Sequence, residues 1–296
     1  MFNQLGLIGC GLIGGSFALA LKRGKLVRRV VGYSKSPSTT ERARLLGVID
    51  EAAPSALLAV SGADLVLLAV PVGASESSFR AMRHGLTSQT LVMDVGSTKS
   101  DVIEAARRGL QDRLANLVPA HPIAGKEVAG IEHAEAGLFV GRRVILTPIK
   151  ATLRSNMQRA TRLWVAMGAE VQTMSAEEHD AAFAAVSHLP HMLAFAYMQS
   201  IAGQAQRARL LELAGSGFRD FSRIAAGDPV LWRDVLLANR RQVLQQSQAF
   251  RQRLEAFEAL LVAGDARTLE QAIAQASRSR ARWQGDADAA RSPAAP

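Results

Sequence analysis

The chain has 296 residues, a formal net charge of +9 and a hydrophobic fraction of 48%, values typical of a globular protein with room for two domains. Its longest apolar run, which begins at Leu65, has about half of the roughly 20 residues that a membrane-spanning helix needs. The first residues form an apolar segment and a glycine loop rather than a signal peptide, and Cys10 is the only cysteine, which excludes an intrachain disulfide. We therefore expect a cytoplasmic protein without a membrane partner.

The positive charge alone does not indicate a nucleic-acid-binding protein. The basic residues are spread along stretches of helical periodicity, mostly opposite the apolar positions, as in NRRQVLQQSQAFRQRLEAF. A solvated helix face explains this distribution, and no known nucleic-acid-binding motif accompanies it. We expect no nucleic-acid partner, and a positive field that attracts anionic small molecules.

Short apolar runs rich in Val, Leu and Ile alternate with helical patterns up to about residue 174. The first crossover helix ends at Gly24, the second begins at Ser36 and Pro37, and a helix around 151–168 follows later. This alternation predicts βαβ units and a parallel, doubly wound sheet of the Rossmann type. The expected strands are 4–9, 28–33, 64–70, 90–95, 143–147 and the piece AEVQTM.

The pattern changes at Ser175, where Ser175 and Glu178 fit a capping box and helical spacing begins to dominate. We expect an all-helical domain from there to about Gln284. Its many apolar positions at 3–4 spacing favour a homodimer, the commonest closed oligomer. The predicted organisation is a dinucleotide-binding Rossmann domain at 1–174, a helical substrate-binding and dimerisation domain at 175–284, and a disordered tail at 285–296.

Three glycines, Gly9, Gly11 and Gly14, stand at G-x-G-x-x-G spacing directly after the first apolar run. The motif opens a helix inside the first βαβ unit, which is the setting of a dinucleotide-binding loop rather than a merely structural turn. There the backbone can approach a pyrophosphate, and the helix N-terminus offers it free N–H groups. The predicted cofactor contacts are Gly9, Gly11, Leu12, Ile13, Gly14, Val70 and Pro71.

The end of the second expected strand bears on the choice of cofactor. An NAD-binding fold usually carries a carboxylate there, about 20 residues after the glycines, to bind the ribose hydroxyls. This chain has Ser34 followed by Lys35 at that point. A hydroxyl and an ammonium suit a 2′-phosphate, so NADP is favoured and NAD remains possible. The alternative is that Lys35 is a solvated loop residue.

Three stretches gather polar groups suited to an anionic substrate. Ser97 follows the strand at 90–95, at the carboxyl edge where doubly wound sheets bind ligands. His121 precedes Pro122 in a glycine-containing segment that we expect to be a loop. Arg219 and Arg223 lie four apart, on one face if the segment is helical, although they could also pair with neighbouring carboxylates on a surface.

Two other kinds of chemistry are disfavoured. His188 and His191 stand at a spacing that could suit a metal, but no cysteine pair or H-E-x-x-H motif completes a ligand set, so we expect no metal. Ser97 lacks the nucleophile-elbow pattern, because Val95 and Lys99 occupy the positions of its two glycines.

Together, GLIGCGLIGGS, DVGSTK, HPIAGKEVAG, SHLPH and GFRDFSRIAAGDPVLWRD resemble the prephenate dehydrogenase family, which includes the cyclohexadienyl and arogenate dehydrogenases of tyrosine biosynthesis. The resemblance spans roughly residues 4 to 240. It implies a Rossmann domain, a dimerising helical domain, and oxidative decarboxylation of prephenate to 4-hydroxyphenylpyruvate or of arogenate to tyrosine. The choice between these substrates, and feedback inhibition by tyrosine, stay open at this point.

The resemblance also implies roles for individual residues. It makes His121 the catalytic histidine and Ser97 the residue that orients it, and it places Glu127 near the mouth of the substrate pocket. The predicted substrate contacts are Ser187, His188, His191, Arg223 and Trp232, with a core position for Trp232 as the alternative. Two other functions remain to be weighed: another two-domain NADP-dependent β-hydroxyacid or imine oxidoreductase, and a non-catalytic dinucleotide-sensing regulator.

Overall fold

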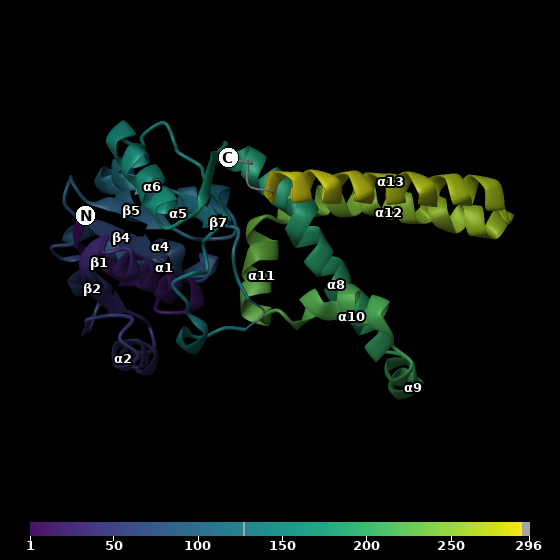
Figure 1. Ribbon diagram of the computed structural model, residues 1–296, viewed down its shortest axis with the longest axis horizontal. Helices are drawn as coiled ribbons and strands as arrows, with labels where there is room; N and C mark the ends of the chain where they lie inside the picture. Colours follow the sequence, from purple (N-terminus) through teal and green to yellow (C-terminus); the bar gives the residue numbers. More distant parts are fainter. Residues whose placement is uncertain (127, 292–296) are drawn as a thin grey trace. The chain divides into compact units, whose positions relative to one another are not determined.

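A computed structural model of the chain describes residues 1–126 and 128–291 (Figure 1). The chain divides into two compact units, Met1–Val243 and Leu244–Pro296. The predicted division at residue 174 therefore does not coincide with the boundary between the compact units, because the first helices after Ser175 pack within the first unit.

A six-stranded parallel sheet forms the centre of the first unit, with the order β3-β2-β1-β4-β5-β6. This is the strand order of a Rossmann fold, and it confirms the predicted doubly wound sheet. The order reverses between β1 and β4. In doubly wound sheets, ligands bind at the carboxyl ends of the strands at such a reversal point. The strands are β1 (Phe2–Ile8), β2 (Val27–Tyr33), β3 (Glu51–Ala52), β4 (Leu65–Leu68), β5 (Leu91–Asp94) and β6 (Leu117–Val118).

Helices cover both faces of this sheet, and the buried strand residues alternate between two hydrophobic clusters. Leu65 and Leu67 belong to the cluster that includes Phe17 and Trp164, whereas Val66 and Leu68 belong to the other. Strands buried on both faces in this way read as continuous apolar runs. The covering helices are α1 (Leu12–Arg23), α2 (Pro37–Leu45), α3 (Ala56–Val60), α4 (Ser75–Met82), α5 (Ser100–Leu110) and α6 (Arg154–Ala166).

A second, three-stranded sheet consists of β7 (Ala120–Pro122), β8 (Arg143–Leu146) and β9 (Glu170–Thr173), with β7 antiparallel to β8. His121 lies on β7 and pairs with Ile145, so the expectation that it stands in a loop is wrong. A strand of three residues that ends in proline shows no detectable alternation, and the glycines that follow it, Gly125 and Gly130, favour a turn. The two-residue strands β3 and β6 were not predicted, because strands this short show no alternation of apolar and polar residues.

After β9 the first unit is helical, as predicted from the capping box. The Ser175 side chain accepts from the Glu178 N–H, and the Glu178 carboxylate accepts from the Ser175 N–H. A wide, π-helical turn at Ala184–His188 joins the first two helices. The helices are α7 (Ala176–Phe183), α8 (Leu189–Ala202), α9 (Arg207–Glu212), α10 (Ser216–Ser222) and α11 (Pro229–Ala238).

The continuous helical stretch Ala176–Ala202 is long and apolar enough, by length and composition, to cross a membrane, a test that core helices of soluble proteins also pass. It carries the buried polar side chains His179, Asp180 and His188. Their hydrogen bonds to neighbouring segments, described below, make this stretch part of the scaffold of the candidate site.

Two long helices, α12 (Arg240–Ala263) and α13 (Ala266–Arg291), make up most of the second unit and lie side by side in Figure 1. Gly264, at φ +63°, makes the turn between them. Residues 285–291 belong to α13, where a disordered tail was predicted. The remaining residues of that tail, 292–296, lie outside the described residues.

Candidate active site

The glycine loop has the geometry of a phosphate-binding turn. Gly9 has φ +98°, and a Cβ there would lie 2.2 Å from the carbonyl oxygen of Ala69. A Cβ on Gly14 would lie 2.2 Å from the Gly9 oxygen, whereas Gly11 at the start of α1 faces open space. Two of the glycines thus permit close packing of the loop, and the third leaves room for a ligand against the backbone.

The other predicted cofactor residues lie around this loop. Val70 follows β4, and its Cγ1 atom would be 3.2 Å from a Cβ on Gly9. The Ser34 hydroxyl accepts from the Cys10 N–H at 2.8 Å, which ties the end of β2 to the loop. Lys35 is exposed beside it. Leu12 and Ile13 form the first turn of α1 and Pro71 follows Val70, so the predicted cofactor set gathers at the carboxyl edge of the sheet.

His121 is the first member of a buried chain of hydrogen bonds. Its Nδ1 atom lies 2.8 Å from Nε2 of His179, and Nδ1 of His179 lies 2.9 Å from Oδ1 of Asp180. His179 is completely buried and Asp180 is 4% exposed. His121 on β7 is thereby connected to two residues of α7, which sequence analysis did not identify.

The start of α5 fixes the carboxylate of Asp180. Its Oδ1 atom accepts from the Lys99 N–H at 2.8 Å, and its Oδ2 atom accepts from the Ser100 N–H at 2.9 Å. The side chain of Asn239, just after α11, donates to the Asp180 backbone oxygen at 2.7 Å. Two segments distant in the sequence therefore hold this residue in place.

A buried ion pair supports the strand that carries His121. The ammonium of Lys99, which is fully buried, contacts the Asp94 carboxylate at the end of β5. The ammonium also donates to the Ala120 oxygen at 2.8 Å, and Asp94 accepts from the Ala120 N–H at 3.2 Å. Both ends of the pair thus bond the residue that precedes His121.

These surroundings determine the protonation states of His121, His179 and Asp180. Burial, together with the nearby His179, Lys99 and His188, holds the pKa of His121 well below its ordinary value. Burial also lowers the pKa of His179, although Asp180 acts in the opposite direction. Burial alone would raise the pKa of Asp180, but the hydrogen bonds from His179, Ser100 and Lys99 outweigh it and lower that pKa. At neutral pH both histidines are neutral and Asp180 is ionised.

Ser97 follows β5. Within residues 1–126 and 128–291, no hydrogen bond joins its hydroxyl to His121. The His121 ring is hydrogen-bonded through its Nδ1 atom to His179, and the predicted orienting role of Ser97 stays a prediction. Whether Ser97 acts on a bound substrate stays a prediction.

His188 has a structural position. Its ring is 1% exposed, its Nδ1 atom accepts from the Asn239 side chain at 3.1 Å, and it bonds the backbone of Ser97. Burial is the main cause that lowers its pKa to about 4. These contacts argue against the predicted substrate contact, because the ring links Asn239, just after α11, to the backbone of Ser97, just after β5.

A second group of predicted residues converges at α8 and α11. The rings of His191 and Trp232 stack with centroids 3.6 Å apart and planes inclined by 21°. Nδ1 of His191 lies 2.8 Å from the backbone oxygen of Ser187, so Ser187 contributes its carbonyl here. Burial lowers the pKa of His191, and the positive charge of Arg223 nearby lowers it further. Glu127, the remaining predicted pocket residue, lies outside the described residues.

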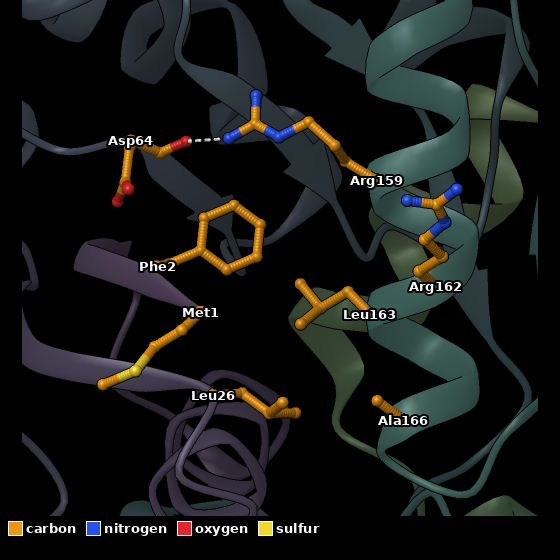
Figure 2. A pocket seen from close by; sticks show the side chains of 8 residues that line it. All are labelled: Met1, Phe2, Leu26, Asp64, Arg159, Arg162, Leu163 and Ala166. Atoms are coloured by element: carbon orange, nitrogen blue, oxygen red, sulfur yellow. Dashed lines mark hydrogen bonds between the residues drawn. The ribbon is translucent and has the colours of Figure 1, made fainter.

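A cavity of about 340 Å³ lies elsewhere, at the amino edge of the sheet. Figure 2 shows the Arg159 guanidinium pointing toward Asp64, whose backbone oxygen accepts from it at 3.1 Å. The Asp64 carboxylate in turn accepts from the Asn3 and Gln4 N–H groups. Since these polar groups already serve the fold, and ligands of doubly wound sheets bind at the carboxyl edge, this cavity is not the candidate site.

The site residues that sequence analysis missed have only weak signals in the sequence. His179 and Asp180 are adjacent in EEHDAAF, which reads as an ordinary polar first half of a helix. Asp94 and Lys99 stand in the DVGSTK stretch, but nothing in the spacing shows that they pair. Within the described residues, no group of three or more His, Cys, Asp or Glu side chains could hold a metal ion.

The fold, the glycine loop and the hydrogen-bonded residues His121, His179 and Asp180 define a Rossmann-type, dinucleotide-binding oxidoreductase. Two family models match the chain: "Prephenate dehydrogenase, nucleotide-binding domain" over residues 17–173, and "Prephenate dehydrogenase, dimerization domain" over residues 175–275. The chain belongs to the prephenate dehydrogenase family.

Individual relatives agree with this assignment. A cyclohexadienyl dehydrogenase of Zymomonas mobilis is 34% identical over 97% of this chain and 98% of its own length. The structure of prephenate dehydrogenase from A. aeolicus, in complex with hydroxyphenyl propionate and NAD+, has a TM-score of 0.89 and 33% identity, covering 95% of this chain and 98% of that one. Synechocystis arogenate dehydrogenase has a TM-score of 0.79 and 29% identity, covering 95% and 99%. The two other functions considered from the sequence have no comparable support.

Proposed function

We propose that the chain catalyses the NAD(P)-dependent oxidative decarboxylation of prephenate, of arogenate or of both. The observation that carries this proposal is the neutral, half-buried imidazole of His121, which is hydrogen-bonded to the buried His179 next to the end of β5. Bound NAD(P)+ supplies the chemistry of a hydride acceptor. The ring carbon that carries the hydroxyl gives up the hydride, and His121 accepts the hydroxyl proton as a carbonyl forms. The ring carboxylate then leaves as carbon dioxide, and its electron pair enters the ring, which becomes aromatic. The carbonyl oxygen becomes a phenolate and takes back the proton that His121 accepted.

The substrate is a small anion, and the second group of residues suits it. Arg223 offers a permanent cation whose planar fork can bind a carboxylate at two points. The stacked rings of His191 and Trp232 offer a flat apolar wall and, on His191, a second nitrogen for a hydrogen bond. We assign the ring of the substrate to this wall and one carboxylate to Arg223.

An assay of the purified chain with each substrate and each nicotinamide cofactor tests the proposal, with reduced nicotinamide followed by its absorbance. We expect turnover with at least one pair, and a kcat lowered about 10²–10⁴-fold in His121→Asn, since a positioned base contributes about that factor. The exposed His84→Asn serves as the matched control. Turnover of neither substrate, or near-normal kcat in His121→Asn, would refute the proposal.

For the cofactor we propose NADP over NAD. Lys35 is exposed at the end of β2, the hydroxyls of Ser36 and Ser38 lie 2.8 Å apart beside it, and the first turn of α2 carries no acidic residue. A helix N-terminus with these neighbours favours a phosphate. We expect Lys35→Ala to lower the ratio of kcat/KM with NADP+ to that with NAD+ about tenfold, the effect of losing ~1.4 kcal/mol. An unchanged ratio, equal to that of Lys150→Ala, would contradict this choice.

We further propose a homodimer in the cytoplasm. The matched family model is named a dimerization domain, and Leu254, Leu261 and Ile273 are exposed on the helices of the second unit. Light scattering should give twice the mass of one chain at micromolar concentration. The mass of a single chain would contradict the dimer. The absence of nucleic-acid and membrane partners stays a prediction.

A further inference from the structure

We infer that His179 and Asp180 are positioning residues that fix the tautomer of His121, with the proton on Nδ1 and the lone pair on Nε2. The inference deepens the proposed function, on which it rests, because it identifies the one ring nitrogen that can accept the substrate proton. Each step follows from which groups can donate and which can accept.

The first step concerns Asp180. Its two carboxylate oxygens accept from the backbone N–H groups of Lys99 and Ser100, at 2.8 and 2.9 Å. These donors favour the ionised carboxylate, which can only accept hydrogen bonds. The 2.9 Å contact between Oδ1 and Nδ1 of His179 therefore requires a proton on that nitrogen.

The second step concerns His179. A neutral imidazole with its proton on Nδ1 has its lone pair on Nε2. The ring is completely buried, which disfavours a second proton. Nε2 of His179 is therefore an acceptor, and the 2.8 Å contact with His121 requires a proton on Nδ1 of His121. The Nε2 atom of His121 keeps the lone pair.

The third step concerns the ring planes. Phe183 contacts both imidazoles, with its centroid 4.8 Å from that of His121 and 4.4 Å from that of His179. This packing limits rotation of the two rings and keeps water from Nδ1 of His121. The neighbouring Lys99 ammonium is already bound to Asp94 and to Ala120, so it cannot replace His179 as a partner.

The arrangement also serves the reaction. When Nε2 of His121 takes the hydroxyl proton, the ring becomes an imidazolium that keeps its Nδ1–H bond to His179. His179 in turn keeps its bond to the Asp180 carboxylate, so the new positive charge faces a fixed negative one through a polarisable ring. In catalytic triads a carboxylate holds the neighbouring histidine in the same way, without itself becoming protonated.

Nitrogen-15 NMR of the full chain at pH 7.5 reads the tautomer directly, because protonated and unprotonated ring nitrogens differ strongly in chemical shift. We expect Nδ1 of His121 to be protonated and Nε2 to be unprotonated in the wild type. His179→Gln places an amide oxygen near the position of Nε2 and should keep this tautomer. His179→Phe removes the acceptor and should give a mixture of tautomers.

Kinetics supply the second readout. We expect His179→Phe to lower kcat about 10²-fold, within the range of general-base effects, with the substrate KM changed by less than about twofold. His179→Gln should recover most of the loss. A wild-type His121 protonated on Nε2, or a His179→Phe variant with wild-type kcat, would overturn the inference. If His179→Phe does not fold, the wild-type tautomer and His179→Gln decide. A chain without turnover but with the expected tautomer would refute the proposed function alone.

Discussion

Lys99 and Asp94 form a buried ion pair whose two members bond opposite sides of the same residue, Ala120. The pair closes the loop between β5 and α5 against β7 and so sets the position of His121. Buried pairs of this kind add little net stability, but the loss of one member leaves the other charge without a partner in a nonpolar environment.

Lys99→Met should lower the free energy of unfolding by about 3–5 kcal/mol, because it leaves the Asp94 carboxylate buried and unpaired. Urea denaturation measures the change, and Lys150→Met, at an exposed lysine, is the control. Replacing both members with apolar residues should cost less than Lys99→Met alone. A loss below about 1 kcal/mol in the single variant would show that the pair does not carry this part of the fold.

The glycine loop allows stability and cofactor binding to be separated. Gly14→Ala brings a Cβ to 2.2 Å from the Gly9 oxygen and should destabilise the protein. Gly11→Ala meets no protein atom within 4 Å and should leave stability almost unchanged. It should nevertheless weaken dinucleotide binding, because the methyl group occupies the space left for the ligand. Thermal unfolding and cofactor titration of both variants test this, and equal dinucleotide affinity in Gly11→Ala and wild type would contradict it.

The buried His188 predicts acid sensitivity of the fold. Its pKa is about 4 in the folded chain, against an ordinary value near 6.5, so below pH 6.5 the unfolded chain binds a proton that the folded chain does not. The corresponding stability is complete above pH 6.5 and is lost as the pH falls toward 4, by about 3 kcal/mol in total. Denaturation between pH 7.5 and 4.5 should show a shallower loss in His188→Asn than in wild type. His84→Asn should follow the wild type, and identical slopes for all three would contradict the prediction.

Arg219, on α10, and Arg223, just after it, lie four residues apart, and both are exposed. If Arg223 holds a substrate carboxylate, Arg223→Ala should raise the substrate KM about 10–100-fold, the loss of one charged hydrogen-bonding group, with a smaller change in kcat. Arg219→Ala should leave both constants near wild type. Equal effects of the two substitutions would assign the requirement to general positive charge rather than to one contact.

Much of the fold could be predicted because its strands are buried on both faces. The runs around Leu5, Val30, Leu67 and Val92 are continuous and apolar, and helical patterns separate them. Strands of two or three residues, such as β7 with His121, have no period to detect. The boundary between the compact units depends on how helices after Ser175 pack, which the sequence does not display.

Of the candidate site, sequence analysis identified the residues that stand in distinctive motifs and not those that support them. His121, His191, Arg223 and Trp232 were named in advance, and the structure groups the last three. His179 and Asn239 were missed because a single buried polar residue on a helix looks like a surface residue until its partners are known. Ser97 was predicted to orient His121, and the contribution of His179, which hydrogen-bonds the same ring, was missed.

The wide turn at Ala184–His188 decides which way two histidines face. In a regular helix, nine residues at roughly 100° each would place His179 and His188 on opposite sides. The extra residue in the turn rotates the second half of the stretch, so that both side chains reach the same interior, one toward β7 and the other toward Asn239. Deleting one residue from this turn would restore a regular helix and would rotate the SHLPH segment away from His121.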